Sequence, residues 1–111
     1  MQRGDIYLVD FSLSVGHEYQ GRRPAVIVQS NSQLKKTNMV TVMPISSQIS
    51  KNHSDDISVS KNDINRLMSD SLVKVHHIKS FDRERFVNKI GMMNETIMKK
   101  VSEYLKIHFG L

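Results

Sequence analysis

Short runs of β-branched and aromatic residues dominate this chain of 111 residues and constrain its fold more than any other feature. They lie at positions 4–11, 24–30, 39–49, 57–60 and 70–81, and polar turn-forming stretches separate them. Alternating apolar side chains indicate half-buried strands, whereas the continuous apolar run after Pro24 indicates a strand buried on both faces. Five or more short strands in one domain predict a small, strongly bent sheet or barrel.

The end of the chain carries the one clear helical pattern. Asn94 is a suitable N-cap, Glu95 in the first turn favours the positive end of the helix dipole, and Gly110 is a suitable C-terminal stop. Apolar side chains fall at spacings of three, four and seven, which predicts one buried stripe on a helix between these caps. The stripe consists of Ile97, Val101, Tyr104, Leu105 and His108. A single helical turn is expected at 61–68.

Two prolines add local expectations. Because proline lacks an N–H group, Pro24 fits the first residue of a strand, and Pro44 should interrupt strand pairing at an edge or a bulge. Residues 70–81 are expected to form one long strand, with His76 and His77 on opposite faces. Two such neighbours cannot bind one metal ion together, so no metal site and no cofactor are expected here.

Composition narrows the class of protein. The net charge of +5 favours a polyanionic partner, although solubility alone also accounts for it. The absence of cysteine excludes disulfides and thiolate-bound zinc. The apolar runs are too short to cross a membrane, and the N-terminus lacks the apolar stretch of a signal peptide, so we expect one cytoplasmic domain over residues 1–111.

Three polar clusters are candidates for a functional site, because each lies on a predicted loop or at a strand end. In the first, guanidinium groups suit phosphodiester oxygens and a tyrosine ring suits stacking on a base. The alternative is a solvated loop held by an ion pair. This cluster consists of His17, Glu18, Tyr19, Gln20, Arg22 and Arg23.

The other two clusters lie in the second halves of the third and fifth apolar runs. Ser46, Ser47 and Gln48 lie just beyond Pro44, where a hydroxyl group binds either a phosphate oxygen or its own backbone turn. The third cluster contains His77 and Lys79, and a histidine here suits a nucleic-acid contact or proton transfer near neutral pH. Taken singly, each of the three clusters is weak support for a functional site.

The order of these motifs along the chain resembles the MazF/PemK family of toxin endoribonucleases. The resemblance rests on RGDIYLVDF, on Gly-x-Glu followed by Gly-x-Arg-Pro, on the Pro-x-Ser-Ser block and on KVHHIKSFDRERF before the helix. It implies a mainly β fold with α structure, a small SH3-like (CcdB/PemK-like) β-barrel with a C-terminal helix. It also implies a homodimer that cuts single-stranded RNA without a metal, leaving a 2′,3′-cyclic phosphate and a 5′-hydroxyl. A cognate antitoxin with an acidic segment would block the RNA groove.

By position, the resemblance places the family's catalytic arginine at Arg23 and its catalytic hydroxyl at Ser46. A fixed guanidinium would stabilise the charge that builds on phosphorus when the 2′-hydroxyl attacks, whereas it is a poor base. The proton acceptor remains open among His17, Glu18 and His77. Substrate-binding roles are expected for the remaining residues of the three clusters: His17, Glu18, Tyr19, Gln20, Arg22, Ser47, Gln48, His77 and Lys79.

Three positions depart from the family pattern. Ser46 stands where threonine is frequent and keeps the hydroxyl, whereas Tyr19 and His77 stand where glutamine is common. These two changes affect the recognised sequence rather than the reaction class. Alternatives are a gyrase poison on the same barrel, an RNA- or DNA-binding module that does not cut, and an inactive relative kept for antitoxin binding. The absence of tryptophan weakens the gyrase alternative, because that contact uses a C-terminal tryptophan.

Overall fold

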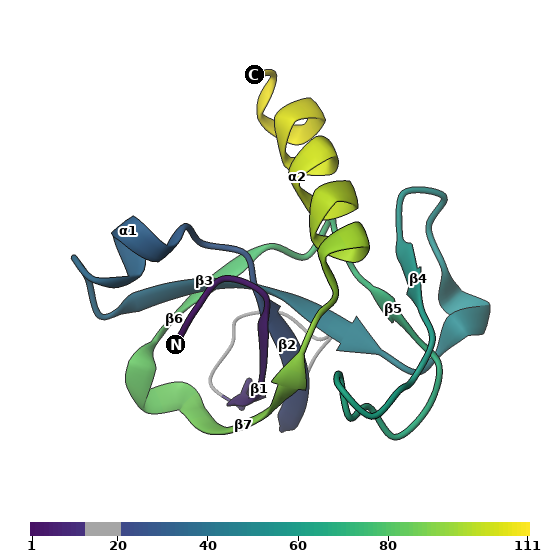
Figure 1. The fold of residues 1–111 in the computed structure, drawn as a ribbon, viewed down its shortest axis with the longest axis horizontal. Coiled ribbons are helices and arrows are strands. Elements are labelled where there is room, and N and C mark those ends of the chain that lie inside the picture. Colours follow the sequence, from purple (N-terminus) through teal and green to yellow (C-terminus); the bar gives the residue numbers. More distant parts are fainter. Residues whose placement is uncertain (13–20) are drawn as a thin grey trace.

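The computed structural model describes residues 1–12 and 21–111. Seven strands and a long C-terminal helix form most of it, as Figure 1 shows. The strands are β1 Asp5–Asp10, β2 Arg22–Ile27, β3 Met39–Ser46, β4 Ile57–Val59, β5 Ser71–Val73, β6 Lys79–Asp82 and β7 Phe86–Met92. The helices are α1 Asn31–Leu34, α2 Glu95–Phe109 and two short 3₁₀ turns, Ile49–Lys51 and Arg83–Arg85.

All strand pairs are antiparallel, and β3 is the hub of the sheet. The order is β4-β5-β3-β2-β1-β7, with β6 paired to β3 off this path. One edge of β3 pairs with β2, whereas the other pairs first with β6, through Val42, and then with β5, from Ile45. The sheet therefore bends sharply along β3 into a barrel-like shape, which confirms the predicted fold class.

Two apolar cores fill the space between these strands. Helix α2 packs over the larger core, to which it contributes Ile97, Val101 and Tyr104, all buried. The smaller core forms around Phe11 and Phe81, whose rings meet edge to face with centroids 4.9 Å apart. Together these clusters bury both faces of the central strand β2, as the continuous apolar run predicts.

The predicted caps of α2 are both present. The Asn94 side chain accepts a hydrogen bond from the Ile97 amide at 2.8 Å, and Gly110 ends the helix with a φ of 69°. That left-handed conformation favours glycine. Of the described helices, none has the length and apolar character needed to span a membrane.

Several expectations about the strands are wrong in detail. Residues 70–81 form two strands, β5 and β6, separated by a turn at 75–76, so His76 and His77 do not share a strand. Strand β2 begins at Arg22, which makes Pro24 its third residue rather than its first. Pro44 lies inside β3, at neither an edge nor a bulge, but at the point where the partner changes from β6 to β5.

The single turn expected at 61–68 is present, closed by one bond of helical spacing from the Arg66 amide to the Asn62 carbonyl at 2.9 Å. Other elements were not predicted. Strand β7 carries no alternating pattern because most of its side chains are exposed, and sequence reasoning missed it. The short helix α1 was also missed; Ser30 caps it within a stretch that reads as a polar connection.

Candidate active site

The first predicted cluster falls largely outside the described residues. His17, Glu18, Tyr19 and Gln20 lie in the undescribed segment, as does most of the glycine-bracketed loop from Gly16 to Gly21. The structure describes Arg22 and Arg23, both exposed at the start of β2. At the base of the segment the Phe11 amide donates to the Gly21 carbonyl at 2.8 Å, which ties its two ends together.

The two arginines have different surroundings. Arg22 pairs with Asp10 across β1 and β2, and Arg23 pairs with Val9. The pKa of the Asp10 carboxyl lies below its ordinary value, first because Ser12 donates hydrogen bonds to it and also because the Arg85 and Arg22 guanidinium groups lie near. Arg22 is thus partly neutralised by an acid.

Arg23 instead lines a pocket of about 340 Å³ where β1, β2, β3 and the loop between β4 and β5 meet. Its lining is mostly apolar and includes a few cationic and hydroxyl groups, which is the usual character of a small-ligand site. The lining consists of Leu8, Arg23, Pro24, Ile45, Ser47, Arg66, Leu67, Met68, Ser69, Ser71 and Ile90. Of the residues predicted from sequence, Arg23 and Ser47 meet in this pocket.

Strand register explains why the arginine and serine clusters come together. Ala25 pairs with Pro44, so Arg23 and Ser46 each lie two residues beyond the last bridge between β2 and β3, at the same end of the ladder. Ser46 is half-buried and pairs with Leu72 of β5. Its Oγ accepts the Gln48 amide at 3.1 Å, the backbone-turn role considered for it. That bond uses a lone pair and not the hydroxyl proton, so Ser46 remains able to donate.

His77 and Lys79 lie elsewhere on the fold. Lys79 begins β6 and pairs with Val42, three residues before the pocket-lining Ile45. His77 is half-buried, and its backbone amide donates to the Lys74 carbonyl at 3.1 Å. Neither residue lines the pocket, and neither does Gln48, which is exposed at the start of a 3₁₀ turn.

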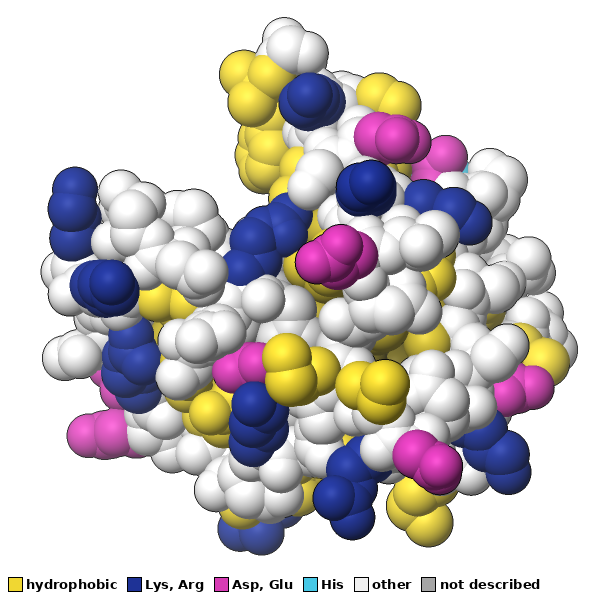
Figure 2. Space-filling model, in the orientation of Figure 1, with side chains coloured by type: hydrophobic (Ala, Val, Ile, Leu, Met, Phe, Trp, Pro, Cys, Tyr) yellow, Lys and Arg dark blue, Asp and Glu magenta, His cyan; other side chains and the backbone are white. Residues whose placement is uncertain are grey.

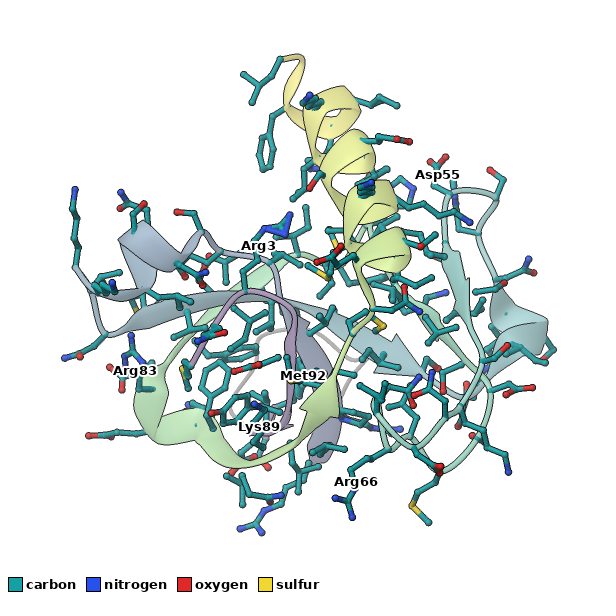
Figure 3. All side chains as sticks on the ribbon, in the orientation of Figure 1. Arg3, Asp55, Arg66, Arg83, Lys89 and Met92 are labelled. Atoms are coloured by element: carbon teal, nitrogen blue, oxygen red, sulfur yellow. The ribbon has the colours of Figure 1, made fainter. Side chains whose placement is uncertain are left out.

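The loop between β4 and β5 adds pocket residues that sequence reasoning missed, among them Arg66, Met68 and Ser69, and β5 adds Ser71. Arg66 has a φ of 56°, a left-handed conformation that is uncommon for a residue with a side chain. Figure 3 shows Arg66 at the lower edge of the fold, on this loop. In the sequence, the turn at Arg66 is indicated only by the preceding residues Asn62 to Asn65, which are rich in turn-forming types.

Buried polar contacts hold this loop in place. Asn65 is 2 % exposed, and its Oδ1 accepts the amides of Asn62 at 3.0 Å and Leu67 at 3.1 Å. Its Nδ2 donates to the Ser60 carbonyl at 2.9 Å. The loop also presses on β7 at Gly91, where an added Cβ would lie 2.4 Å from the Asn65 carbonyl oxygen. The position of Arg66 is therefore set by the surrounding structure and not by its own preference.

Charge at the pocket is locally positive, although the surface as a whole is mixed. Figure 2 shows Lys and Arg side chains spread over the visible face with acidic groups between them. Within the pocket lining, Arg23 and Arg66 are the charged residues, and three serines accompany them. Fixed guanidinium donors next to hydroxyl donors suit an oxyanion such as a phosphate group.

Two solved structures share this fold over nearly their whole length. Over 100% of this chain and 97% of the other, the fold matches MazF from Deinococcus radiodurans with a TM-score of 0.83 and 20% sequence identity. A mycobacterial structure described as an endoribonuclease in complex with its cognate antitoxin matches with a TM-score of 0.74 and 17% identity, over 100% of this chain and 96% of that chain.

Sequence similarity is closer to a curated relative. The endoribonuclease MazF of Staphylococcus saprophyticus is 32% identical over 112 residues, which cover 100% of this chain and 92% of the relative. Residues 2–109 match the model of the PemK-like, MazF-like toxins of type II toxin–antitoxin systems. The chain belongs to this family, as its motif order predicts.

Proposed function

We propose that the chain is a toxin endoribonuclease that cleaves single-stranded RNA, messenger RNA included, at short sequences without a metal ion. The observation that carries the proposal is the pocket that joins Arg23 and Ser47 beside Ser46, in a chain of the MazF-like family. Two guanidinium groups in its lining match a polyanionic substrate better than a neutral one.

In the proposed reaction, the ribose 2′-oxygen attacks the adjacent phosphorus and the bond from phosphorus to the 5′-oxygen breaks. The products carry a 2′,3′-cyclic phosphate and a 5′-hydroxyl. Arg23 stabilises the negative charge on the non-bridging oxygens, which is larger in the transition state than in the ground state. Ser46 donates a further hydrogen bond to the same oxygens.

The reaction also needs a group that accepts the 2′-proton and a donor to the 5′-oxygen. The group that accepts the 2′-proton is proposed to be His17, Glu18 or His77, and of these His77 also contributes to RNA binding. Arg23 is a donor toward the departing 5′-oxygen, because arginine stays protonated in water. The other residues proposed for RNA binding are Tyr19, Gln20, Arg22, Ser47, Gln48 and Lys79, and Arg66 joins them as a second cation at the pocket.

We also propose a homodimer in the cytoplasm whose RNA groove is closed by a cognate antitoxin with an acidic segment. The net charge of +5 supports an acidic partner. Exposed large apolar side chains, three of which belong to the last five residues of the chain, support a contact with another chain. Those three are Ile107, Phe109 and Leu111.

The test is to incubate the purified protein with long single-stranded RNA in EDTA and to identify the chemistry of the new ends. We expect discrete fragments with cyclic phosphate and 5′-hydroxyl ends, and no fragments with the Arg23→Ala variant. Binding of RNA without cleavage would instead indicate a nucleic-acid-binding module or an inactive relative. Cleavage that persists undiminished in Arg23→Ala would contradict the role proposed for Arg23.

A further inference from the structure

Three metal-ligating side chains meet beside helix α2, outside the Arg23 pocket. His53 and Asp55 come from the loop between the 3₁₀ turn Ile49–Lys51 and β4, and His76 comes from the turn between β5 and β6. One ligand atom of each lies within 4.8 Å of the others. Figure 3 shows Asp55 beside α2, far across the fold from Arg66.

One carboxylate oxygen is the centre of this cluster. Asp55 Oδ2 lies 3.0 Å from His76 Nε2 and 3.6 Å from His53 Nδ1. Two ligands bound tetrahedrally to one Zn²⁺ ion at about 2.0–2.2 Å are separated by about 3.4 Å, so both distances are close to what a shared ion requires. The two imidazole rings already meet edge to face, with centroids 4.2 Å apart.

A second layer of contacts orients His76. Its Nδ1 lies 3.0 Å from the Tyr104 hydroxyl, which in turn lies 2.9 Å from His108 Nδ1. Metal-bound histidines characteristically engage their other ring nitrogen in this way, which fixes the tautomer and aims the free nitrogen at the ion. Tyr104 is buried in the larger apolar core, so its hydroxyl group is held in a fixed position beside His76.

The loop that carries His53 and Asp55 is also anchored. Lys74 Nζ lies 2.5 Å from Asp56 Oδ2 and donates to the Lys51 carbonyl at 2.9 Å. The same Asp56 oxygen accepts the His53 amide at 2.8 Å. These bonds on both sides hold the ligand-bearing residues in position before any ion binds.

We propose that His53, Asp55 and His76 bind one divalent transition-metal ion of the Zn²⁺ class, with Tyr104 as a positioning residue. Two imidazoles and a carboxylate suit such ions better than Mg²⁺ or Ca²⁺, which take mostly oxygen ligands. The side chains of the three are 38–55% exposed, which leaves room for water in the fourth position. When the ion binds, His53 Nδ1 gives up the hydrogen bond of 3.1 Å that it accepts from the Asp55 amide and coordinates the ion instead.

Such an ion would cross-link segments that are distant in sequence. It would join the loop before β4 to the turn after β5 and, through Tyr104, to helix α2. None of the three ligands lines the Arg23 pocket, so the site is structural or regulatory and the proposed cleavage reaction does not pass through it.

The test is titration of tag-free, EDTA-treated full-length protein with Zn²⁺ alone, followed by calorimetry and by the thermal unfolding midpoint. We expect one ion per chain and a midpoint that rises with free Zn²⁺, because the ion binds the folded chain. Asp55→Asn and His76→Gln should abolish both effects. Glu103→Gln, which removes an exposed carboxylate on α2, should leave both intact.

Two further measurements separate the site from non-specific binding. Co²⁺ should give the intense visible absorption of a four-coordinate ion in the wild type but not in Asp55→Asn. Tyr104→Phe should weaken Zn²⁺ binding about 10–100-fold while the circular dichroism spectrum stays unchanged. Absence of binding, or equal binding by wild type, Asp55→Asn and His76→Gln, would overturn the proposal.

Discussion

The pocket around Arg23 differs in construction from the polar network that Lys74 and Asp56 form with Lys51 and His53. At the pocket, Arg23, Arg66 and Ser47 are exposed at the ends of strands or on a loop, in a mostly apolar lining. Under the helix, Lys74 and Asp56 are buried, with side chains 10% and 1% exposed, and each bonds to several groups. The first group of side chains lies exposed around a pocket, whereas the second is buried and holds the fold together.

This difference predicts that changes in the two regions affect different properties. Substitutions in the network should lower stability strongly, because they leave buried charge without a partner. Substitutions at the pocket should lower RNA cleavage while the free energy of unfolding changes little.

The largest expected effect comes from Lys74→Met. This change leaves the Asp56 carboxylate buried without its cation, which should lower the free energy of unfolding by about 3–5 kcal/mol. Urea denaturation of wild type and variant measures it, with Lys99→Met on the exposed face of α2 as the matched control. A loss as small as that of the control would show that the pair is not a stability determinant.

Next is Arg23→Ala, which should lower the rate of RNA cleavage by about 100-fold or more, the scale for removing a charge-stabilising donor. Arg22→Ala removes the same charge one residue earlier, beside Asp10, and should lower the rate by less than about tenfold. Single-turnover kinetics compare the two. A fall below tenfold for Arg23→Ala would contradict its assignment as the stabilising group.

Gly91→Ala tests the link between stability and the pocket, because Gly91 packs against the loop that carries Arg66. Its new Cβ would lie 2.4 Å from the Asn65 carbonyl oxygen, a backbone atom that has no room to move alone. The loop that carries Arg66 must therefore shift, which we expect to lower the free energy of unfolding by about 1–3 kcal/mol. Thermal and urea unfolding test it; Gly21→Ala is an unsuitable control because Gly21 has a φ of 71°.

Lowering the pH should reduce the free energy of unfolding by less than Lys74→Met does, because the side chains of Asp56 and Lys74 both stay in place. Burial by itself raises the pKa of Asp56, but hydrogen bonds from the His53 amide and from Lys74 together hold it below its ordinary value. The ionised carboxylate therefore adds stability above about pH 3.9, and this is lost as the pH falls through the folded pKa. Stability measured against pH should lose this component in Asp56→Asn.

The sequence predicts best where the signal is local. Helix α2 was placed correctly because its caps, Asn94 and Gly110, and its buried stripe all lie within one short segment; of the predicted stripe, His108 is exposed. Strand β1 was placed correctly for a similar reason: its apolar residues, Ile6 to Val9, form one short run between Asp5 and Asp10. Family motifs placed Arg23, Ser46 and Ser47 in one site; Arg23 and Ser47 line the same pocket, whereas Ser46 does not.

The errors arise where distant partners decide the structure. The run 70–81 breaks after β5, where Lys74 pairs with Asp56, 18 residues earlier in the chain. Arg66 reaches the pocket because Asn65 and Gly91 fix its loop, a contact that no periodicity reveals. His76 was paired with its neighbour His77, but in the fold it meets His53, Asp55 and Tyr104.

The most direct measurement of the central claim is a chemical-shift map of the ¹⁵N-labelled protein with an RNA that cannot react. Its sequence is that found by cleavage mapping, with a 2′-deoxy nucleotide at the attacking position so that the nucleophile is absent. We predict that the amides of Arg23, Ser47, Arg66 and Ser69 shift on binding while those of His53, Asp55 and His76 do not. Shifts confined to His53, Asp55 and His76, with the amides of the pocket unchanged, would contradict the proposal that RNA binds at the Arg23 pocket.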